Sequence, residues 1–194
     1  MITELKKKIY KKPPKNGKYY VLAIDGRGGA GKTTLTDYLE KLLTDFSVLN
    51  GDEYFEPDDN TIAFGSFNEE RFEKEVLSQL RDGKSEFTYR PYRWGEKEPM
   101  SNKDLKITEG IIIERSGSFA FDLDYDCRIW VETPAQLALQ RGQERDEMPL
   151  EQGYRSWKEV WQPKEDAHFK KVKPLVTADL VIDGTKSFQQ QVAW

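Results

Sequence analysis

One glycine-rich segment constrains the fold of this chain more than any other feature. Residues 26–33 have the sequence Gly-Arg-Gly-Gly-Ala-Gly-Lys-Thr and fit the spacing G-x-x-x-x-G-K-[ST]. The apolar run 19–25 before them is typical of a buried strand, and the leucines after them recur at helical spacing. A glycine loop between a strand and a helix predicts an α/β fold with a phosphate-binding loop.

The other elements alternate along the chain in the same way. Apolar runs predict further strands at 46–49, 111–113, 129–131 and 178–182. Helical patterns follow at 35–44, at 68–83, after Pro134 and at 150–162. Such alternation is typical of an open, mostly parallel sheet that is covered on both faces. Residues 86–108 alternate aromatic and polar side chains, which indicates a β-excursion or hairpin.

Length and composition fit one domain. The 194 residues are 37% hydrophobic and 33% charged, which is enough apolar material for a core. No apolar run approaches a membrane span, no signal-peptide pattern is found, and a single cysteine, Cys127, excludes an internal disulfide. The one histidine, His168, argues against a structural zinc site and is expected on a helix surface. We therefore expect a cytoplasmic protein with no membrane partner.

The first 18 residues differ in charge from the rest. They carry seven lysines and one acid, whereas the whole chain has a formal net charge of −4. We interpret residues 1–18 as a solvated basic arm, with Ile2, Leu5 and Ile9 as a short helical stripe, and residues 19–194 as one domain. Contact of the arm with nucleic acid or anionic lipid is the alternative. We favour the solvated arm, because it has no arginine and no interleaved aromatic side chains that would stack on bases.

The glycine loop offers the groups that hold a nucleoside triphosphate. Successive backbone N–H groups and the start of the following helix can converge on phosphate oxygens. Lys32 is placed to reach the β- and γ-phosphates, and the Thr33 hydroxyl can coordinate Mg²⁺. An incidental glycine turn is the alternative. The candidate ATP-binding residues are Gly26, Arg27, Gly28, Gly29, Ala30, Gly31, Lys32, Thr33 and Thr34.

Two acidic residues directly follow predicted strands. Glu114 comes after the run 111–113, where an acid can hold Mg²⁺ through water or polarise a nucleophile. Asp52 follows the second strand, and a carboxylate beside the γ-phosphate can accept a proton from an attacking hydroxyl. The candidate metal ligands are Thr33, Asp52 and Glu114. The alternatives are a surface glutamate and an acidic, solvated loop.

A pair of arginines completes the candidate catalytic residues. Arg141 and Arg145 lie one helical turn apart, on one face of a predicted helix, and can close over the transferring phosphoryl group. Gly142 weakens this helix locally, so we interpret residues 141–149 as a lid. A surface network with neighbouring acids is the alternative. The candidate catalytic residues are Lys32, Asp52, Glu114, Arg141 and Arg145.

Taken together, these motifs resemble the uridine kinase and phosphoribulokinase-like family of P-loop kinases, and in particular its bacterial uridine kinase-like branch. The strand that ends in Glu114 is part of the resemblance, and the other segments that carry it are 24–34, 52–57, 90–94, 141–146 and 178–184. The resemblance implies a three-layer sandwich around a five-stranded parallel sheet in the order 2-3-1-4-5. It also implies Mg·ATP as the phosphoryl donor and a nucleoside as the acceptor.

The resemblance further implies roles on the acceptor side. Asp52 would be the base for the sugar 5′-hydroxyl, and the excursion at 86–108 would wall the acceptor site. The implied substrate-binding residues are Asp52, Tyr54, Asn68, Arg90, Tyr92 and Arg93.

Three positions depart from the family's pattern. Asn68 stands where uridine kinases often have an aspartate, Arg93 replaces the aspartate of Tyr-Asp-Trp, and Arg115 follows Glu114 where glycine is usual. These departures leave two further hypotheses open, namely a kinase for another, anionic acceptor and a nucleotide-dependent ATPase or switch. The sequence predicts neither the acceptor nor the oligomeric state.

Overall fold

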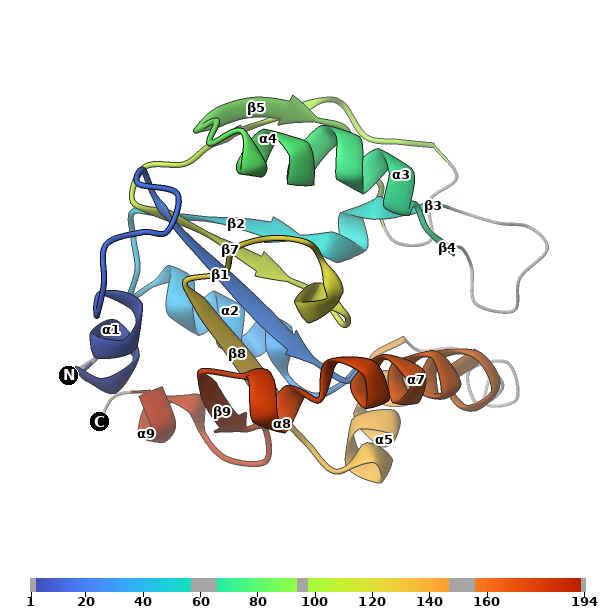
Figure 1. Ribbon diagram of the computed structural model, residues 1–194. Coiled ribbons are helices and arrows are strands. Elements are labelled where there is room, and N and C mark those ends of the chain that lie inside the picture. The colour runs from blue at the N-terminus through green and yellow to red at the C-terminus, as the bar shows by residue number, and fades with distance from the viewer. Residues whose placement is uncertain (1–2, 57–65, 94–97, 147–155, 193–194) are drawn as a thin grey trace.

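A five-stranded sheet, parallel throughout, forms the centre of the molecule (Figure 1). The structure is a computed structural model that describes residues 3–56, 66–93, 98–146 and 156–192. Across the sheet, the strands are β2 (Phe46–Asn50), β7 (Gly110–Glu114), β1 (Tyr20–Gly26), β8 (Cys127–Glu132) and β9 (Leu180–Asp183). Counted along the chain this order is 2-3-1-4-5, so the predicted fold class is confirmed.

The central strand β1 is apolar on both faces. Val21 and Ala23 belong to one buried cluster, whereas Leu22 and Ile24 belong to another, because successive side chains of a strand point to opposite faces. Both faces of the sheet are therefore covered, which explains why its strands are continuous apolar runs in the sequence.

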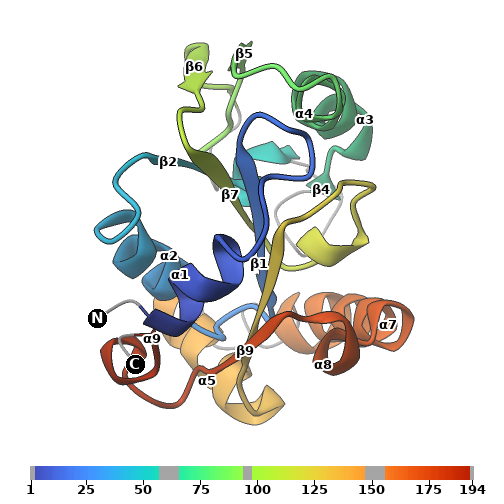
Figure 2. The ribbon, with the colours of Figure 1, turned by 60° about the vertical axis from the view of Figure 1, so that its left-hand side comes forward.

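Helices cover the two faces of the sheet (Figure 2). The cluster of Leu22 receives apolar side chains from α1 (Thr3–Ile9), α2 (Lys32–Glu40) and α9 (Phe188–Val192). The cluster of Val21 receives them from α3 (Glu69–Phe72), the π-helical turn η2 (Glu73–Leu77), α4 (Ser78–Arg81), the 3₁₀ turn η3 (Ser118–Ala120) and α7 (Gln162–Val172). The molecule is thus the expected three-layer sandwich.

The remaining helices lie in the second half of the chain. They are α5 (Ala135–Asp146), the π-helical η4 (Ser156–Trp161), which leads directly into α7, and α8 (Pro174–Thr177). The helical segment that begins with η4 therefore extends ten residues beyond the end that we predicted at residue 162. The first part of the predicted helix, 150–155, and residues 147–149 of the predicted lid lie outside the described residues.

Small β-elements stand apart from the main sheet. The 3₁₀ turn η1 (Gly51–Tyr54) follows β2 and leads to β3 (Phe55–Glu56), which pairs with β4 (Ser66–Phe67). Strands β5 (Glu86–Tyr89) and β6 (Lys103–Lys106) pair antiparallel, which confirms the hairpin predicted for residues 86–108. Residues 94–97 of that excursion are outside the described part of the chain.

The basic N-terminal segment packs against the body. Leu5 and Ile9 form the predicted stripe on α1, and both are buried in the cluster of Leu22 rather than standing apart in a solvated leader. Ile2 lies outside the described residues. The lysines take part as well: the Lys15 Nζ donates to the Tyr125 carbonyl at 2.6 Å. Apolar burial of the stripe therefore holds this segment in place.

Candidate active site

A cleft of about 1390 Å³ opens at the carboxyl ends of β1, β2 and β7. Figure 1 shows the arrowhead of β1 pointing toward α5 and α7, whose residues line the same cleft. Its volume exceeds the roughly 300–1,000 Å³ of a typical single-ligand pocket, so two substrates can fit. The predicted residues that line it are Gly28, Gly29, Gly31, Lys32, Thr33, Thr34, Asp52, Glu114, Arg141 and Arg145.

The glycine loop is shaped by close backbone contacts. Gly29 (φ 76°) and Gly31 (φ 101°) adopt the left-handed conformation that side chains disfavour. A Cβ atom at Gly28 would lie 2.5 Å from the Trp157 ring, and one at Gly29 would lie 2.1 Å from the Ala138 carbonyl oxygen. The glycines therefore allow the loop to turn and allow its backbone to lie close to α5 and η4.

The loop leads into α2 without a side-chain cap. Gly31 occupies the N-cap position and makes no capping hydrogen bond, so the first N–H groups of α2 remain available for an anion. The Lys32 side chain is buried and folds back over the loop, where its Nζ donates to the Arg27 carbonyl at 3.0 Å. The loop therefore presents backbone N–H groups and a lysine, which are groups that can hold a phosphate.

Thr33 and Glu114 meet at the base of the cleft. The Thr33 hydroxyl donates to Glu114 Oε2 at 3.3 Å. A hydroxyl and a carboxylate are hard oxygen donors of the kind that hold Mg²⁺ together with phosphate oxygens and water. The described residues contain no cluster of three His, Cys, Asp or Glu side chains suited to a metal. A magnesium ion here would therefore depend on the nucleotide for part of its coordination.

Burial dominates the electrostatics of Glu114. The residue is only 3% exposed, and burial raises the pKa of its carboxyl to about 7, with the Asp52 charge acting in the same direction. Lys32, the Thr33 hydroxyl and Arg145 lower that pKa. These neighbours therefore offset only part of the cost of desolvation, and the protonated form of Glu114 is favoured more than in water.

Asp52 reaches the same cleft from β2. Asn50 pairs with Glu114 in the register of the parallel strands, and its Oδ1 accepts a hydrogen bond from the Asp52 N–H at 2.9 Å. The resulting turn, η1, leaves the Asp52 side chain exposed on the cleft wall. Strand register therefore brings the two predicted acids to neighbouring positions.

Both predicted arginines of α5 line the cleft. Arg141 Nη1 donates to the Gly184 carbonyl at 2.8 Å, and the Arg145 guanidinium lies 6.0 Å from the centre of the Trp157 ring. Gly142, between them, gives room to that ring, because a Cβ there would lie 2.4 Å from it. We attributed this glycine to a weakened lid helix, and the structure adds a packing reason for it.

One buried dyad was missed by the sequence analysis. Asp25, fully buried at the end of β1, accepts hydrogen bonds from the N–H groups of Gly26, Gly117 and Phe119 at 2.7–3.0 Å. His168 Nε2 lies 3.0 Å from Asp25 Oδ2, and its side chain is only 14% exposed. The expectation that His168 is a surface residue is therefore wrong, because this side chain of α7 packs against the end of β1.

Glu165, three residues earlier on α7, contacts the glycine loop directly. Its Oε1 accepts from the Gly28 N–H at 2.6 Å and from the Ser116 hydroxyl at 3.2 Å. Arg27 forms ion pairs with Glu165 at 3.6 Å and Asp166 at 2.7 Å. Arg27 is thus directed toward α7 and is not among the residues that line the cleft; nor are Gly26 and Ala30.

The residues predicted to hold a nucleoside lie elsewhere, with the exception of Asp52. Tyr54 is fully buried and its hydroxyl donates to Glu75 at 3.1 Å. Asn68 caps α3 through the Arg71 N–H and donates to Glu56 Oε2, both at 2.9 Å. The other predicted substrate-binding residues, also absent from the cleft lining, are Arg90, Tyr92 and Arg93.

Comparisons with known proteins agree with this architecture. A structure from Bacillus stearothermophilus, described as a possible uridine kinase, is 18% identical with a TM-score of 0.66 and covers 93% of this chain and 100% of its own. A structure from Silicibacter sp. TM1040, provisionally described as a fructose transport system kinase, is 17% identical with a TM-score of 0.62 and covers 93% and 98%.

The similarity to known proteins is found in the structure and not in the sequence. Neither a scan against protein-family models nor a search of curated proteins found a match. Among the helices that the structure describes, none is long and apolar enough to cross a membrane. The sheet order, the glycine loop and the two structural neighbours show that the chain has the fold of the uridine kinase-like P-loop kinases.

Proposed function

We propose that this chain is an ATP-dependent phosphotransferase that moves the γ-phosphoryl group of ATP to a hydroxyl of a small molecule. One observation carries the proposal: a single cleft is lined by the glycine loop, the Glu114 carboxyl, both arginines of α5 and Asp52. Phosphoryl transfer requires positioning and charge stabilisation rather than covalent chemistry by the protein. The cleft brings together the groups for both tasks.

On the donor side, the chain's own residues hold and neutralise the triphosphate. The loop N–H groups and Lys32 bind the β- and γ-phosphates, and Arg141 and Arg145 neutralise the charge that gathers on the transferring group. When bound, Mg²⁺ would supply positive charge that offsets part of the negative charge of the triphosphate. Thr33 and Glu114 are the residues that would hold it.

On the acceptor side, Asp52 acts as the general base. The acceptor hydroxyl oxygen forms a bond to the γ-phosphorus, the bond from that phosphorus to the β–γ bridging oxygen breaks, and the hydroxyl proton passes to Asp52. ADP and the phosphorylated acceptor are the products. Asp52 suits this role because its carboxyl is exposed on the cleft wall.

The chemical class of the acceptor molecule is also proposed rather than shown. A nucleoside is the class that the likeness to a possible uridine kinase suggests. Tyr54 and Asn68, however, already use their polar atoms within the chain. We therefore propose a small hydroxyl compound, with nucleosides as one class to test. A cytoplasmic location, where ATP and Mg²⁺ are available, fits this activity.

Release of ADP tests the proposal. With Mg·ATP and a panel of hydroxyl compounds, we expect one acceptor to raise ADP release sharply above the basal rate. Asp52→Asn should slow that transfer by about 10²–10⁴-fold, as expected for a lost general base, with ATP binding retained. Asp104→Asn, on the hairpin and outside the cleft lining, is the matched control.

The donor side is tested independently. Lys32→Ala should weaken ATP binding as well as turnover, because it removes the cation beside the glycine loop. Unchanged ATP affinity and turnover in Lys32→Ala would contradict the loop assignment. ADP release that no acceptor stimulates would instead indicate an ATPase or switch.

A further inference from the structure

Arg115 lies beside the proposed base, in the cleft. It directly follows β7 and lines the cleft together with Asp52. Its aliphatic part packs on Gly51, the residue before Asp52: a Cβ at Gly51 would lie 2.5 Å from Arg115 Cδ and 2.7 Å from Arg115 Cβ. Position 51 therefore has room for the arginine only because it has no side chain.

The guanidinium of Arg115 rests on aromatic rings. It lies 3.5 Å from the centre of the Phe67 ring and 5.6 Å from those of Phe55 and Phe121. Contacts of this kind orient a cation and partly compensate it for lost water. The rings thus fix the arginine in one place on the acceptor side of the cleft.

Arg115 has no anionic partner in the part of the chain that the structure describes. Its Nε is buried without a hydrogen-bond acceptor, and no carboxylate forms an ion pair with its guanidinium. Arg71, by contrast, pairs with Glu56 at 2.6 Å and with Glu75 at 3.2 Å. Arg115 is therefore a cation in the cleft that no carboxylate of the described residues neutralises through an ion pair.

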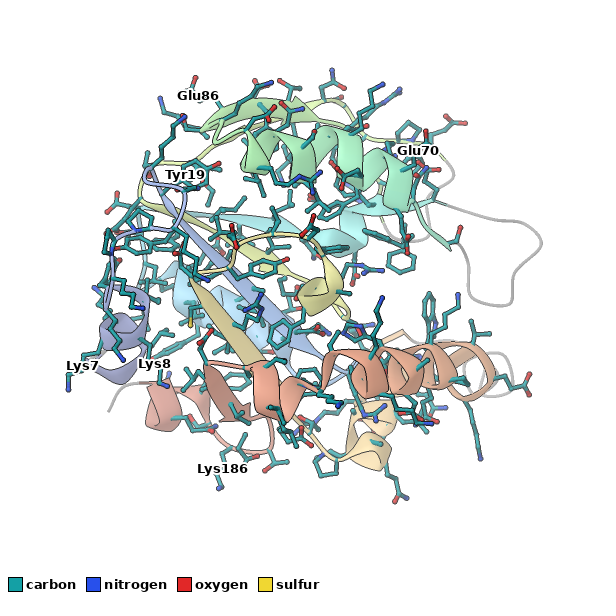
Figure 3. All side chains as sticks on the ribbon, in the orientation of Figure 1. Lys7, Lys8, Tyr19, Glu70, Glu86 and Lys186 are labelled. Carbon is teal, nitrogen blue, oxygen red and sulfur yellow. The ribbon has the colours of Figure 1, made fainter. Side chains whose placement is uncertain are left out.

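Arg115 is half-buried, and the loss of water around its guanidinium is costly; the local charges only partly offset this cost. Burial lowers the pKa of Arg115, while the more distant charges of Asp52, Asp25 and Glu69 raise it. Glu69 and Glu70 are exposed at the start of α3, where Figure 3 shows Glu70 near the edge of the molecule. Neither forms an ion pair with Arg115.

We propose that the acceptor carries an anionic group, a phosphate or a carboxylate, which Arg115 binds while the acceptor hydroxyl lies at Asp52. This inference rests on the proposed kinase function and deepens it. A guanidinium binds either anion through two parallel hydrogen bonds, a geometry that a lysine does not reproduce. The anionic group is unchanged in the reaction, which transfers the γ-phosphoryl group to the hydroxyl and its proton to Asp52.

Matched acceptors test the inference. Wild-type protein with Mg·ATP is compared on glycerol, glycerate and glycerol 3-phosphate, on ribose and ribose 5-phosphate, and on uridine and uridine 5′-monophosphate. We expect kcat/KM for an anionic member to exceed that of its neutral partner by about 10- to 100-fold, the scale of hydrogen bonds to a charged group. The preferred member distinguishes a phosphate from a carboxylate.

Variants assign the preference to Arg115. Arg115→Gln should abolish the preference for anionic acceptors, mainly by raising KM. Arg115→Lys should retain only part of this preference, because a lysine lacks the two parallel N–H donors of a guanidinium. Gly51→Ala should act like Arg115→Gln although the charge remains, since it displaces the side chain. Arg128→Gln, outside this cleft, is the control and should keep the wild-type ratio.

Binding of the acceptor can also be measured directly, which allows variants with low turnover to be compared. With ADP present, the anionic acceptor should raise the thermal midpoint of the wild type and of Arg128→Gln, but not that of Arg115→Gln. Equal use of neutral and anionic acceptors, or an Arg115→Gln effect on kcat alone with a shifted pH profile, would overturn the inference and leave the kinase proposal standing. Failure of every acceptor to stimulate ADP release would overturn both.

Discussion

At the scale of single residues, folding and ligand binding favour different protonation states of Glu114. Its burial favours the protonated form, whereas a metal ion or a phosphate-bound cation beside it favours the carboxylate. The folded chain keeps this proton up to about pH 7, while the unfolded chain releases it near the ordinary value of 4.5. Stability therefore falls as the pH rises from 4.5 to 7, and the loss persists above that range.

Replacement of Glu114 by glutamine should remove this pH dependence. Between pH 5 and pH 8 we expect the unfolding free energy of the wild type to fall, relative to that of Glu114→Gln, by about 2–3 kcal/mol. Urea unfolding without nucleotide or Mg²⁺ measures this difference. Glu86→Gln is the control, because Glu86 is exposed on the β5–β6 hairpin (Figure 3). Parallel pH profiles for wild type and Glu114→Gln would contradict the assignment.

At the scale of elements, the glycine loop and α5 fit together through their backbones. Gly29 and Gly17 have nearly the same φ, 76° and 73°, and both values disfavour a side chain. A Cβ at Gly29 would lie 2.1 Å from the Ala138 carbonyl oxygen, whereas one at Gly17 would meet nothing within 4 Å. The two positions therefore separate backbone strain from a clash between elements.

Alanine at each position should show this difference. Gly17→Ala should cost about 1 kcal/mol through its left-handed conformation alone. Gly29→Ala should cost about 2 kcal/mol more, because the loop or α5 must move, and ATP affinity should fall with it. Denaturant unfolding and nucleotide titration give the two readouts. Similar losses of stability in the two variants would argue against tight packing of loop and α5.

The elements also show what the sequence could predict. The glycine loop and the alternation of strands and helices follow from local motifs and buried apolar runs, and were predicted from them. The strand order was implied only by the family resemblance, and the register that places Asn50 beside Glu114 was not predicted. The bond between His168 and Asp25 joins residues 143 positions apart, and no periodicity indicates it. Tyr54 was expected to hold substrate, yet it lies in an aromatic cluster with Phe72 and Tyr89 that only tertiary packing assembles.

At the scale of the whole molecule, α1 is part of the core. Leu5 and Ile9 are 1% and 2% exposed and share a cluster with β1, β7 and β8. We expect Leu5→Ala to lower the unfolding free energy by about 2–4 kcal/mol, as for other large-to-small core changes. Lys6→Ala, on the exposed face of the same helix, should change it by less than about 0.5 kcal/mol. Equal, small effects in urea unfolding would show that α1 folds apart from the sheet.

The contact between Gly51 and Arg115 has a consequence for the natural variation of this sequence. A larger residue at position 51 and an arginine at position 115 exclude each other sterically. In homologues with a small residue at 115, we expect position 51 to accept residues larger than glycine. In homologues that retain the arginine, we expect glycine at position 51. An alignment deep enough to measure covariation should show these two positions changing together.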